Sequence, residues 1–189
     1  MQYTISDLIS ALPVVVQKNI SLSNYSTMRV GGNADYFIEP ESIEQMVAVL
    51  SAFEKAGQPY LLLGNGSNTV FSDDGLHIPV IHAGHALAEV TVTGNRIIAG
   101  AGALLSSVSK SALEHSLTGL EFASGIPGSI GGAVCMNAGA YGGDMSQVLR
   151  SVTVFAKGQV QKMPVDQLRL GYRSSEIMRQ KWVVLSAEL

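Results

Sequence analysis

The segment Thr118–Gly143 constrains the fold of this chain more than any other. It holds eight of the chain's twenty glycines among small apolar residues, and Glu121 is its only charged side chain. Glycine at this density interrupts regular helices and strands, and Pro127 fixes one turn. We therefore expect a surface on which main-chain N–H groups can approach a ligand.

Length and composition limit the domain count of the chain and the classes of partner that this surface can bind. A chain of 189 residues with 47% hydrophobic residues can form one domain, or one domain of two lobes, around a sizeable core. The net charge of −3, with 12 Lys and Arg spread singly, provides no basic stripe for nucleic acid. The first residues, MQYTISDLISALPVVVQ, contain neither a basic leader nor an apolar run of membrane length. We expect a cytoplasmic protein without nucleic-acid or membrane partners.

The first part of the chain has the pattern of a small α/β lobe. Ala34–Glu39 alternates like a strand, and residues 43–53 carry apolar side chains along one helical face up to Gly57. Tyr60–Leu63 is a short apolar strand that runs directly into Gly64–Asn68, here called the glycine loop. Because ligands of open α/β sheets bind at the carboxyl ends of strands, the glycine loop is a candidate binding loop.

The second part has the pattern of paired strands. Leu87–Thr93 and Arg96–Ala99 flank the turn Gly94-Asn95, and 151–156 and 159–162 flank the turn Lys157-Gly158. Residues 104–115 form a plausible helix, and 182–187 a final strand. We place the division between the lobes at residues 78 and 79, giving lobes 1–78 and 79–189.

The glycine loop taken alone has two interpretations. It lacks the Gly-Lys-Ser/Thr ending of a P-loop, and Thr69 stands where the Rossmann fingerprint requires glycine. Its glycines, amides and hydroxyl can coordinate a phosphate oxygen or form an ordinary turn. The second glycine cluster, Gly125–Gly132, favours the phosphate interpretation, because a pyrophosphate has enough oxygens for two such loops. Together the loops suggest a dinucleotide.

Other chemistries have little support in the sequence. Motifs of serine hydrolases, zinc proteases and dithiol oxidoreductases are missing. His77, His82 and His85 lack a nearby carboxylate or thiol to complete a metal site, and we expect surface or strand-edge positions for them and no metal. Asp73-Asp74 reads as a turn. The single Cys135 excludes an internal disulfide and reads as a small, buried apolar residue.

Arg173 stands beside Tyr172 in a weakly charged stretch, Gly171–Ser175. A guanidinium there can clamp a carboxylate or a phosphate. The alternative is a surface salt bridge, and composition does not decide between the two.

Four motifs, in order over essentially the whole chain, resemble the UDP-N-acetylenolpyruvoylglucosamine reductase (MurB) family. They are NYSTMRVGG at 24–32, LGNGSN at 63–68, the glycine-rich segment from Gly119 through GIPGSIGG to MNAGAYGG, and the Tyr172-Arg173 pair. The glycine-rich segment is the most specific of them.

The resemblance implies an α+β fold: the two-lobed FAD-binding module of the vanillyl-alcohol-oxidase (PCMH) type, with a small α/β lobe and a larger lobe of mainly antiparallel sheet. It implies a flavoprotein oxidoreductase of peptidoglycan synthesis, and so of cell-wall biogenesis, cell shape and cell division. FAD would be held non-covalently and reduced by NADPH. Hydride would then pass to the enolpyruvyl group of UDP-N-acetylglucosamine enolpyruvate, giving UDP-N-acetylmuramate.

The same resemblance implies roles for individual residues. The pyrophosphate would be held by Gly64, Asn65, Gly66, Ser67 and Asn68. The flavin and its phosphates would be lined by Gly125, Pro127, Gly128, Ser129 and Gly132, and the site would be closed by Asn137, Ala138, Gly139 and Tyr141. Arg173 would be the catalytic arginine that stabilises negative charge on the substrate carboxylate, with Tyr172 flanking it.

Family members continue for roughly another domain's length, which carries the proton-donating serine, an assisting glutamate and much of the grip on the uridine diphosphate. We therefore expect these 189 residues to be the FAD-binding portion without the substrate-binding C-terminal domain, inactive alone, and open to self-association through an exposed apolar face. Two alternatives stay open. One is another flavin oxidase of this fold, although no histidine is a clear candidate for a covalent flavin link. The other is a non-enzymatic nucleotide-binding module.

Overall fold

The computed structural model describes residues 4–189, which divide into two compact units between Ala86 and Leu87. Strand β4 (Val80–His82) belongs to the sheet of the first unit, since it pairs with two earlier strands. The first unit therefore extends past residue 78, where the sequence pattern placed its end. The short apolar run of β4 resembles the hairpin strands that follow it. For this reason the sequence pattern placed the boundary before β4, although β4 belongs to the first unit.

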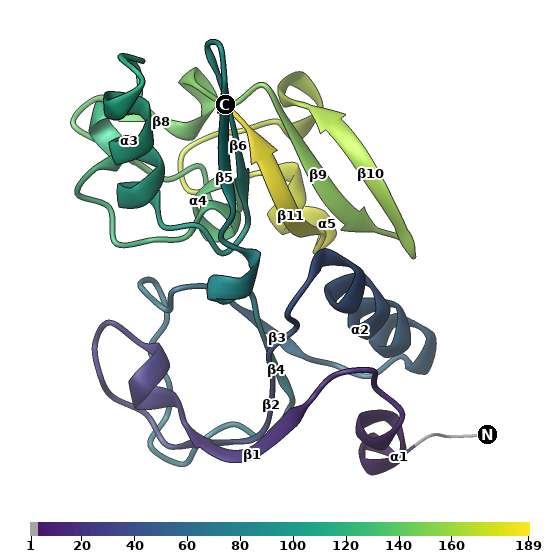
Figure 1. The fold of residues 1–189 in the computed structure, drawn as a ribbon. Coiled ribbons are helices and arrows are strands. Elements are labelled where there is room, and N and C mark those ends of the chain that lie inside the picture. Colours follow the sequence, from purple (N-terminus) through teal and green to yellow (C-terminus); the bar gives the residue numbers. More distant parts are fainter. Residues whose placement is uncertain (1–3) are drawn as a thin grey trace. The chain divides into compact units, whose positions relative to one another are not determined.

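The first unit is built on a four-stranded sheet in the order β1-β2-β4-β3 (Figure 1). Its other strands are β1 (Val16–Ser21), β2 (Asn33–Ile38) and β3 (Leu61–Leu63). The pair β1 and β2 is antiparallel, whereas β2 and β3 both run parallel to β4. The two parallel pairs place the carboxyl ends of β2, β3 and β4 at one edge of the sheet.

Helix α2 (Ile43–Ala56) confirms the predicted helix of this unit. It begins at Ser42, whose Oγ accepts a hydrogen bond from the N–H of Gln45 at 3.2 Å. It ends at Gly57, which has a φ of 61°. Helix α1 (Ile5–Ser10) begins with a capping box in which Thr4 and Asp7 exchange hydrogen bonds.

The second unit is built on a five-stranded antiparallel sheet in the order β10-β9-β11-β6-β5. The strands are β5 (Val90–Thr93), β6 (Arg96–Gly100), β9 (Ser151–Ala156), β10 (Gln159–Pro164) and β11 (Val183–Glu188). Strand β11, the last in sequence, runs between β9 and β6 (Figure 1). The predicted hairpins β5–β6 and β9–β10 are confirmed, as is the final strand.

Three helices complete the second unit: α3 (Leu105–Glu114), α4 (Ile130–Cys135) and α5 (Glu176–Gln180). The core contains the fully buried side chains of Leu105, Ile130 and Val154, so α3, α4 and the sheet share it. Helix α4 contacts β11, β6 and α5. Two very short strands, β7 (Gly139–Ala140) and β8 (Gly143–Asp144), form a separate hairpin.

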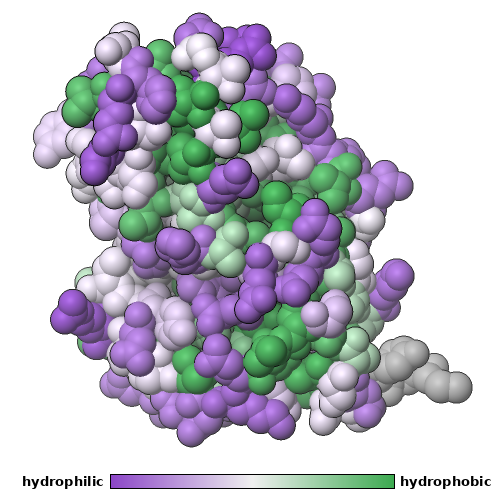
Figure 2. Space-filling view, in the orientation of Figure 1, coloured by the Kyte–Doolittle hydropathy of each residue, from purple (hydrophilic) through white to green (hydrophobic). Residues whose placement is uncertain are grey.

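The face of the molecule drawn in Figure 2 carries hydrophobic side chains among hydrophilic ones. In the second unit, the large apolar side chains with the greatest exposure are Leu113, Tyr141 and Tyr172. Within residues 4–189, every helix is too short or too polar to reach across a bilayer.

Candidate flavin site

The glycine loop follows β3 at the carboxyl edge of the parallel strands, as predicted. Gly66 is buried and has a φ of 61°, and an added Cβ would lie 1.8 Å from the main-chain oxygen of Tyr25. Only glycine fits this position. The main-chain N–H of Thr27 donates to the oxygen of Gly66 at 3.3 Å. The chain around Tyr25 therefore fixes the loop from one side, while Asn65 and Asn68 are exposed.

Two glycines of the glycine-rich segment are explained by packing within the second unit. A Cβ on Gly131 would lie 3.1 Å from the Cβ of Ala101, where α4 packs on the chain after β6. A Cβ on Gly139 would lie 2.6 Å from the main-chain oxygen of Gly143, so the β7–β8 hairpin requires glycine there. These positions serve the fold whether or not a ligand binds.

Gly125 and Gly132 have no such explanation. A Cβ on Gly125 would meet nothing within 4 Å, and its φ is not positive. Gly132 lies inside α4, and its Cβ would meet only the Oγ of Ser129, at 3.9 Å. A helical glycine costs about 0.5–1 kcal/mol relative to alanine. Both residues are exposed, so the missing side chains keep open a surface that the protein itself does not fill.

The beginning of α4 is fixed to the preceding chain by its main chain. The N–H groups of Ile130 and Gly131 donate to the oxygens of Ala103 and Ala101, at 2.8 and 2.9 Å. Ser129 occupies the N-cap position and is 3% exposed, yet its hydroxyl makes no capping hydrogen bond. The hydroxyl oxygen lies 3.9 Å from the place of a Cβ on Gly132. Pro127 is exposed and Gly128 half-buried in the approach to α4.

Asn137, expected to face the cofactor, has a different set of partners. It is buried and has a φ of 48°. Its Nδ2 donates to Asp144 Oδ2 at 3.2 Å and to the oxygen of Gly171 at 3.3 Å, and its Oδ1 accepts from the N–H of Ser146 at 3.0 Å. The amide thus connects the end of α4 to the β7–β8 hairpin and to the turn at residues 171–174, here called the Arg173 turn.

Ala138 and Tyr141, two other residues predicted to close the cofactor site, differ strongly in exposure. Ala138 is buried, and its N–H donates to the oxygen of Ala133 at 2.8 Å. Tyr141 is 99% exposed at the tip of the β7–β8 hairpin. Of the pair, only Tyr141 presents a side chain that a bound molecule could contact.

Arg173 lies at the tip of a tight turn. Gly171 and Ser174 exchange main-chain hydrogen bonds of 3.0 and 3.2 Å, and Arg173 itself has a φ of 52°. Its Nη1 lies 3.7 Å from the sulfur of Met136, at the end of α4. Among residues 4–189, no carboxylate forms an ion pair with it. The surface salt bridge considered from the sequence is thus not found, and the exposed guanidinium can receive an anionic ligand.

Ser175 is a site-supporting residue that the sequence analysis missed. Its hydroxyl donates to the main-chain oxygen of Cys135 and accepts from the N–H of Met178 at 3.0 Å, and the residue is fully buried. It caps α5 and also joins the Arg173 turn to α4. Serine directly before the acidic Glu176 is a typical helix N-cap signal, but the bond to Cys135 has no signal in the sequence.

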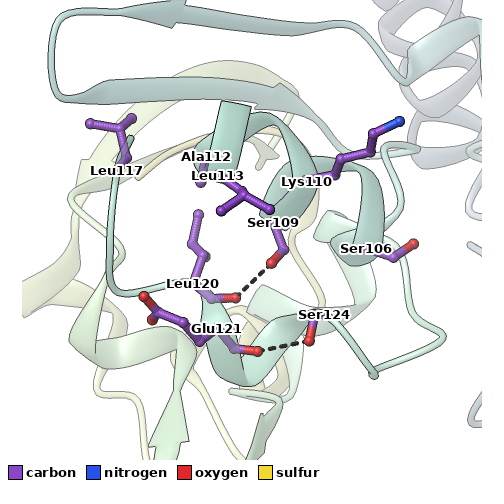
Figure 3. Close-up of a pocket in the computed structure, with 9 residues that line it drawn as sticks. All are labelled: Ser106, Ser109, Lys110, Ala112, Leu113, Leu117, Leu120, Glu121 and Ser124. Atoms are coloured by element: carbon purple, nitrogen blue, oxygen red, sulfur yellow. Dashed lines mark hydrogen bonds between the residues drawn. The ribbon is translucent and has the colours of Figure 1, made fainter. Parts of the chain in front are cut away.

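A surface pocket of about 350 Å³ lies between α3 and residues 117–124 (Figure 3). The hydroxyls of Ser109 and Ser124 donate to the main-chain oxygens of Leu120 and Glu121, both at 2.9 Å. None of the predicted cofactor residues lines this pocket. The pKa of Glu121 is lowered by hydrogen bonds from its own N–H, from Thr118 and from Gly119. Glu121 therefore stabilises the turn at the start of the glycine-rich segment.

The surroundings of Cys135, His82 and His77 suit structural roles and not catalytic ones. Burial raises the pKa of the Cys135 thiol, which disfavours a nucleophilic thiolate. His82 lies 2.8 Å from Glu39, and His77 lies 3.1 Å from Asp35. No group of three metal-ligating side chains occurs in the part of the chain that the structure describes.

Comparison with known proteins finds a matching family. The model of the FAD binding domain family matches residues 34–163. This range contains the glycine loop and the whole glycine-rich segment.

Curated relatives are nearly half identical to the chain over the aligned region. UDP-N-acetylenolpyruvoylglucosamine reductase of Clostridium novyi is 46% identical over 173 residues, which cover 91% of this chain and 56% of the relative. The enzyme of the same name from Geobacillus kaustophilus is 46% identical over 171 residues, covering 90% of this chain and 56% of the relative. The chain thus spans a little over half the length of these relatives.

Solved structures confirm the predicted fold class. The UDP-N-acetylenolpyruvylglucosamine reductase (MurB) of Thermus caldophilus superposes with a TM-score of 0.78 at 34% identity, covering 92% of this chain and 61% of that one. Cholesterol oxidase from Brevibacterium sterolicum superposes with a TM-score of 0.67 at 13% identity, covering 94% and 37%. The second likeness concerns the fold alone: a mixed α+β module of the PCMH type with an antiparallel sheet.

Proposed function

The chain belongs to the FAD binding domain family, and we propose that it is the flavin-binding portion of a UDP-N-acetylenolpyruvoylglucosamine reductase of peptidoglycan synthesis. The observation that carries the proposal is Gly132. This residue lies exposed inside α4, where neither packing nor backbone conformation requires glycine. A surface kept free of side chains at a helix start suits the close approach of a large planar cofactor.

The proposed contacts follow from what each residue offers. In the first unit, the glycine loop, residues 64–68, holds the pyrophosphate with main-chain N–H groups and the Ser67 hydroxyl. In the second unit, Gly125, Pro127, Gly128 and Gly132 provide open surface, and the Ser129 hydroxyl donates a hydrogen bond. Tyr141 contacts the cofactor from the hairpin tip. Asn137, Ala138 and Gly139 act through main-chain and internal contacts, because their side chains are engaged in or excluded by the fold.

FAD supplies hydride chemistry between NADPH and the enolpyruvyl group. The role of Arg173 in that reaction is electrostatic. Its exposed guanidinium binds the substrate carboxylate and stabilises the negative charge that develops there. Two main-chain hydrogen bonds close the turn that carries Arg173, which limits the reorganisation of its backbone during the reaction. Tyr172, 93% exposed beside it, flanks the same ligand.

The relatives are longer, and we propose that the 189 residues bind FAD without completing substrate reduction. We further propose that FAD is bound non-covalently, that the chain works in the cytoplasm, and that its exposed apolar side chains allow self-association at high concentration.

The proposal is tested by purifying the 189-residue protein and titrating it with FAD, following the loss of flavin fluorescence. We expect saturable binding with one FAD per chain, a yellow protein, and release of all colour on denaturation. Gly132→Leu fills the open surface of α4 and should abolish binding while the protein still folds. A protein that folds but binds FAD no better than this variant would refute the proposal. Substrate-dependent oxidation of NADPH by the 189 residues alone would refute the claim of incomplete chemistry.

A further inference from the structure

The main chain of Tyr25–Met28 sets the position of the glycine loop in the first unit. The oxygen of Tyr25 occupies the place of the missing Gly66 side chain, and the N–H of Thr27 donates to the Gly66 oxygen at 3.3 Å. The Ser26 hydroxyl donates to the oxygen of Thr69 at 3.3 Å, just after the loop. A shift of Tyr25 would therefore move Gly66 and its neighbouring N–H groups.

The ring of Tyr25 is held by two other rings. Its centroid lies 4.3 Å from that of Phe37, which is fully buried in β2, and 5.1 Å from that of His82 in an edge-to-face arrangement of 79°. Phe37 and His82 lie 5.4 Å apart. The three rings form one cluster under the loop.

The imidazole of His82 is fixed on its other side. Its Nδ1 lies 2.8 Å from Glu39 Oε1, and its side chain is only 14% exposed. Gln17 donates to the second oxygen of Glu39 at 3.0 Å. A Cβ on Gly84 would lie 3.0 Å from the ring, so Gly84 leaves just enough room for the imidazole. The ring therefore has little freedom to move away from Tyr25.

His82 also stands directly beside the start of the loop. It pairs with Leu63, the residue before Gly64, across the parallel strands β3 and β4. The next N–H, of Ala83, donates to the oxygen of Leu63 at 2.8 Å. The loop is thus fixed through main-chain bonds at its start and through the Tyr25 ring in its middle.

We propose that His82, oriented by Glu39, is a positioning residue for FAD binding, because its ring holds Tyr25 and thereby holds the N–H groups of the glycine loop in place. The inference rests on the proposed function, since it assumes that this loop binds the pyrophosphate. The carboxylate of Glu39 sets the orientation of the imidazole, and Tyr25 transmits that orientation to Gly66. The sequence placed His82 only as a surface or strand-edge histidine.

The test compares the 189-residue protein with His82→Ala, His82→Phe and Glu39→Ala. FAD affinity is measured by fluorescence quenching, and the phosphorus NMR resonances of bound FAD are recorded at saturation. The matched control is Phe53→Leu, which breaks another edge-to-face pair of this unit, the 5.5 Å contact with Tyr60, away from the loop.

We expect His82→Ala to weaken FAD binding by about tenfold, which is the change in affinity expected when an aromatic pair that positions the loop is lost. The phosphorus resonances should also shift. His82→Phe keeps a ring beside Tyr25 and should recover affinity to within about threefold of the parent. Glu39→Ala, at a half-exposed position, should shift the resonances in the same direction by a smaller amount. Phe53→Leu should lower stability and leave the resonances in place.

Unchanged affinity and resonances in both His82→Ala and Glu39→Ala would overturn the inference while leaving the proposed function intact. Equal shifts in Phe53→Leu would also overturn it, since loosening of the unit in general would then explain the effect. A parent protein that folds but fails to bind FAD would refute the proposed function, and this inference with it.

Discussion

The side-chain amide of Asn137 donates a hydrogen bond of 3.3 Å to the main-chain oxygen of Gly171, 34 residues later in the sequence. This bond joins the end of α4 to the turn that carries Arg173. The same amide bonds Asp144 and Ser146. Together with the bond from Ser175 to Cys135, this buried side chain fixes the glycine-rich segment to the turn of the candidate catalytic arginine.

Replacement of Asn137 should loosen this junction. Asn137→Ala removes the three hydrogen bonds of the side-chain amide and places alanine at a φ of 48°. The Gly171 oxygen keeps the Ser174 N–H, and the Ser146 N–H keeps Asp144 Oδ1. We expect a loss of about 2–4 kcal/mol in the free energy of unfolding, measured with urea. Asn137→Gly removes only the hydrogen bonds and should lose less.

A second readout of the same substitution is trypsin cleavage after Arg173. Cleavage should be faster in both Asn137 variants, because the turn opens more often. Parent-like stability and cleavage would show that the junction does not depend on this amide.

Gly132→Ala should change stability and FAD binding in opposite directions. Alanine favours α4 by about 0.5–1 kcal/mol and meets no atom closer than 3.9 Å. FAD affinity should fall about tenfold, because the methyl group occupies ligand space. Ser107→Ala on the exposed face of α3 is the control, which should raise stability slightly and leave FAD affinity unchanged. If Gly132→Ala binds FAD as the parent does, the open surface of α4 is not the cofactor surface.

Arg173→Gly should not destabilise the second unit. The guanidinium has no carboxylate partner within residues 4–189, and its φ of 52° favours glycine. We expect the free energy of unfolding to stay the same or rise by up to about 1 kcal/mol. Lys181→Gly is the matched control, since Lys181 ends α5 with a φ of 56°. A clear destabilisation by Arg173→Gly alone would reveal a structural role for the arginine.

Glu188 should make a pH-dependent contribution to stability. Its carboxylate accepts from Lys162 at 2.7 Å, from Ser151 at 3.1 Å and from Arg96 at 3.3 Å. Hydrogen bonds, first that of Lys162 and then that of Ser151, lower its pKa from the ordinary value of 4.5. The folded state therefore binds fewer protons than the unfolded state at acidic pH. The stabilisation is present above the pKa that Glu188 has in the unfolded state, and it is lost as the pH falls through the pKa that Glu188 has in the folded state.

The measurement compares the parent with Glu188→Gln in urea at neutral pH and at about pH 3. The parent should be more stable at neutral pH, and the difference should shrink in acid and in high salt. A difference that is constant with pH would mean that the cluster contributes through packing and not through charge.

Much of the fold could be predicted from local sequence. The helix after Pro40 follows from its apolar period and ends at Gly57 as glycine dictates, and the Gly94-Asn95 turn fixes the β5–β6 hairpin. Strand β1 was missed, because VQKNIS is polar and lies at the edge of its sheet. The β7–β8 hairpin was missed because its strands are only two residues long.

The candidate site was predictable where backbone geometry demands a particular residue, as at Gly66. It was less predictable where one residue type serves two purposes. Gly125 and Gly131 look alike in the sequence, yet only Gly131 has a packing reason to be glycine. The bonds from Asn137 to Gly171 and from Ser175 to Cys135 span 34 and 40 residues of the chain, and no local pattern encodes such contacts.

The central place of β11 in its sheet has a consequence for protein synthesis. Strands β9 and β6 both pair with β11, which is the last strand of the second unit to leave the ribosome. The second unit therefore cannot close its sheet until translation has passed Glu188, whereas the sheet of the first unit is complete once His82 has emerged. We expect the nascent chain to carry a folded first unit and an open second one for the time needed to translate about a hundred residues, several seconds at ordinary elongation rates. During that interval the unpaired edges of β6 and β9 are the parts of the chain most in need of protection from aggregation.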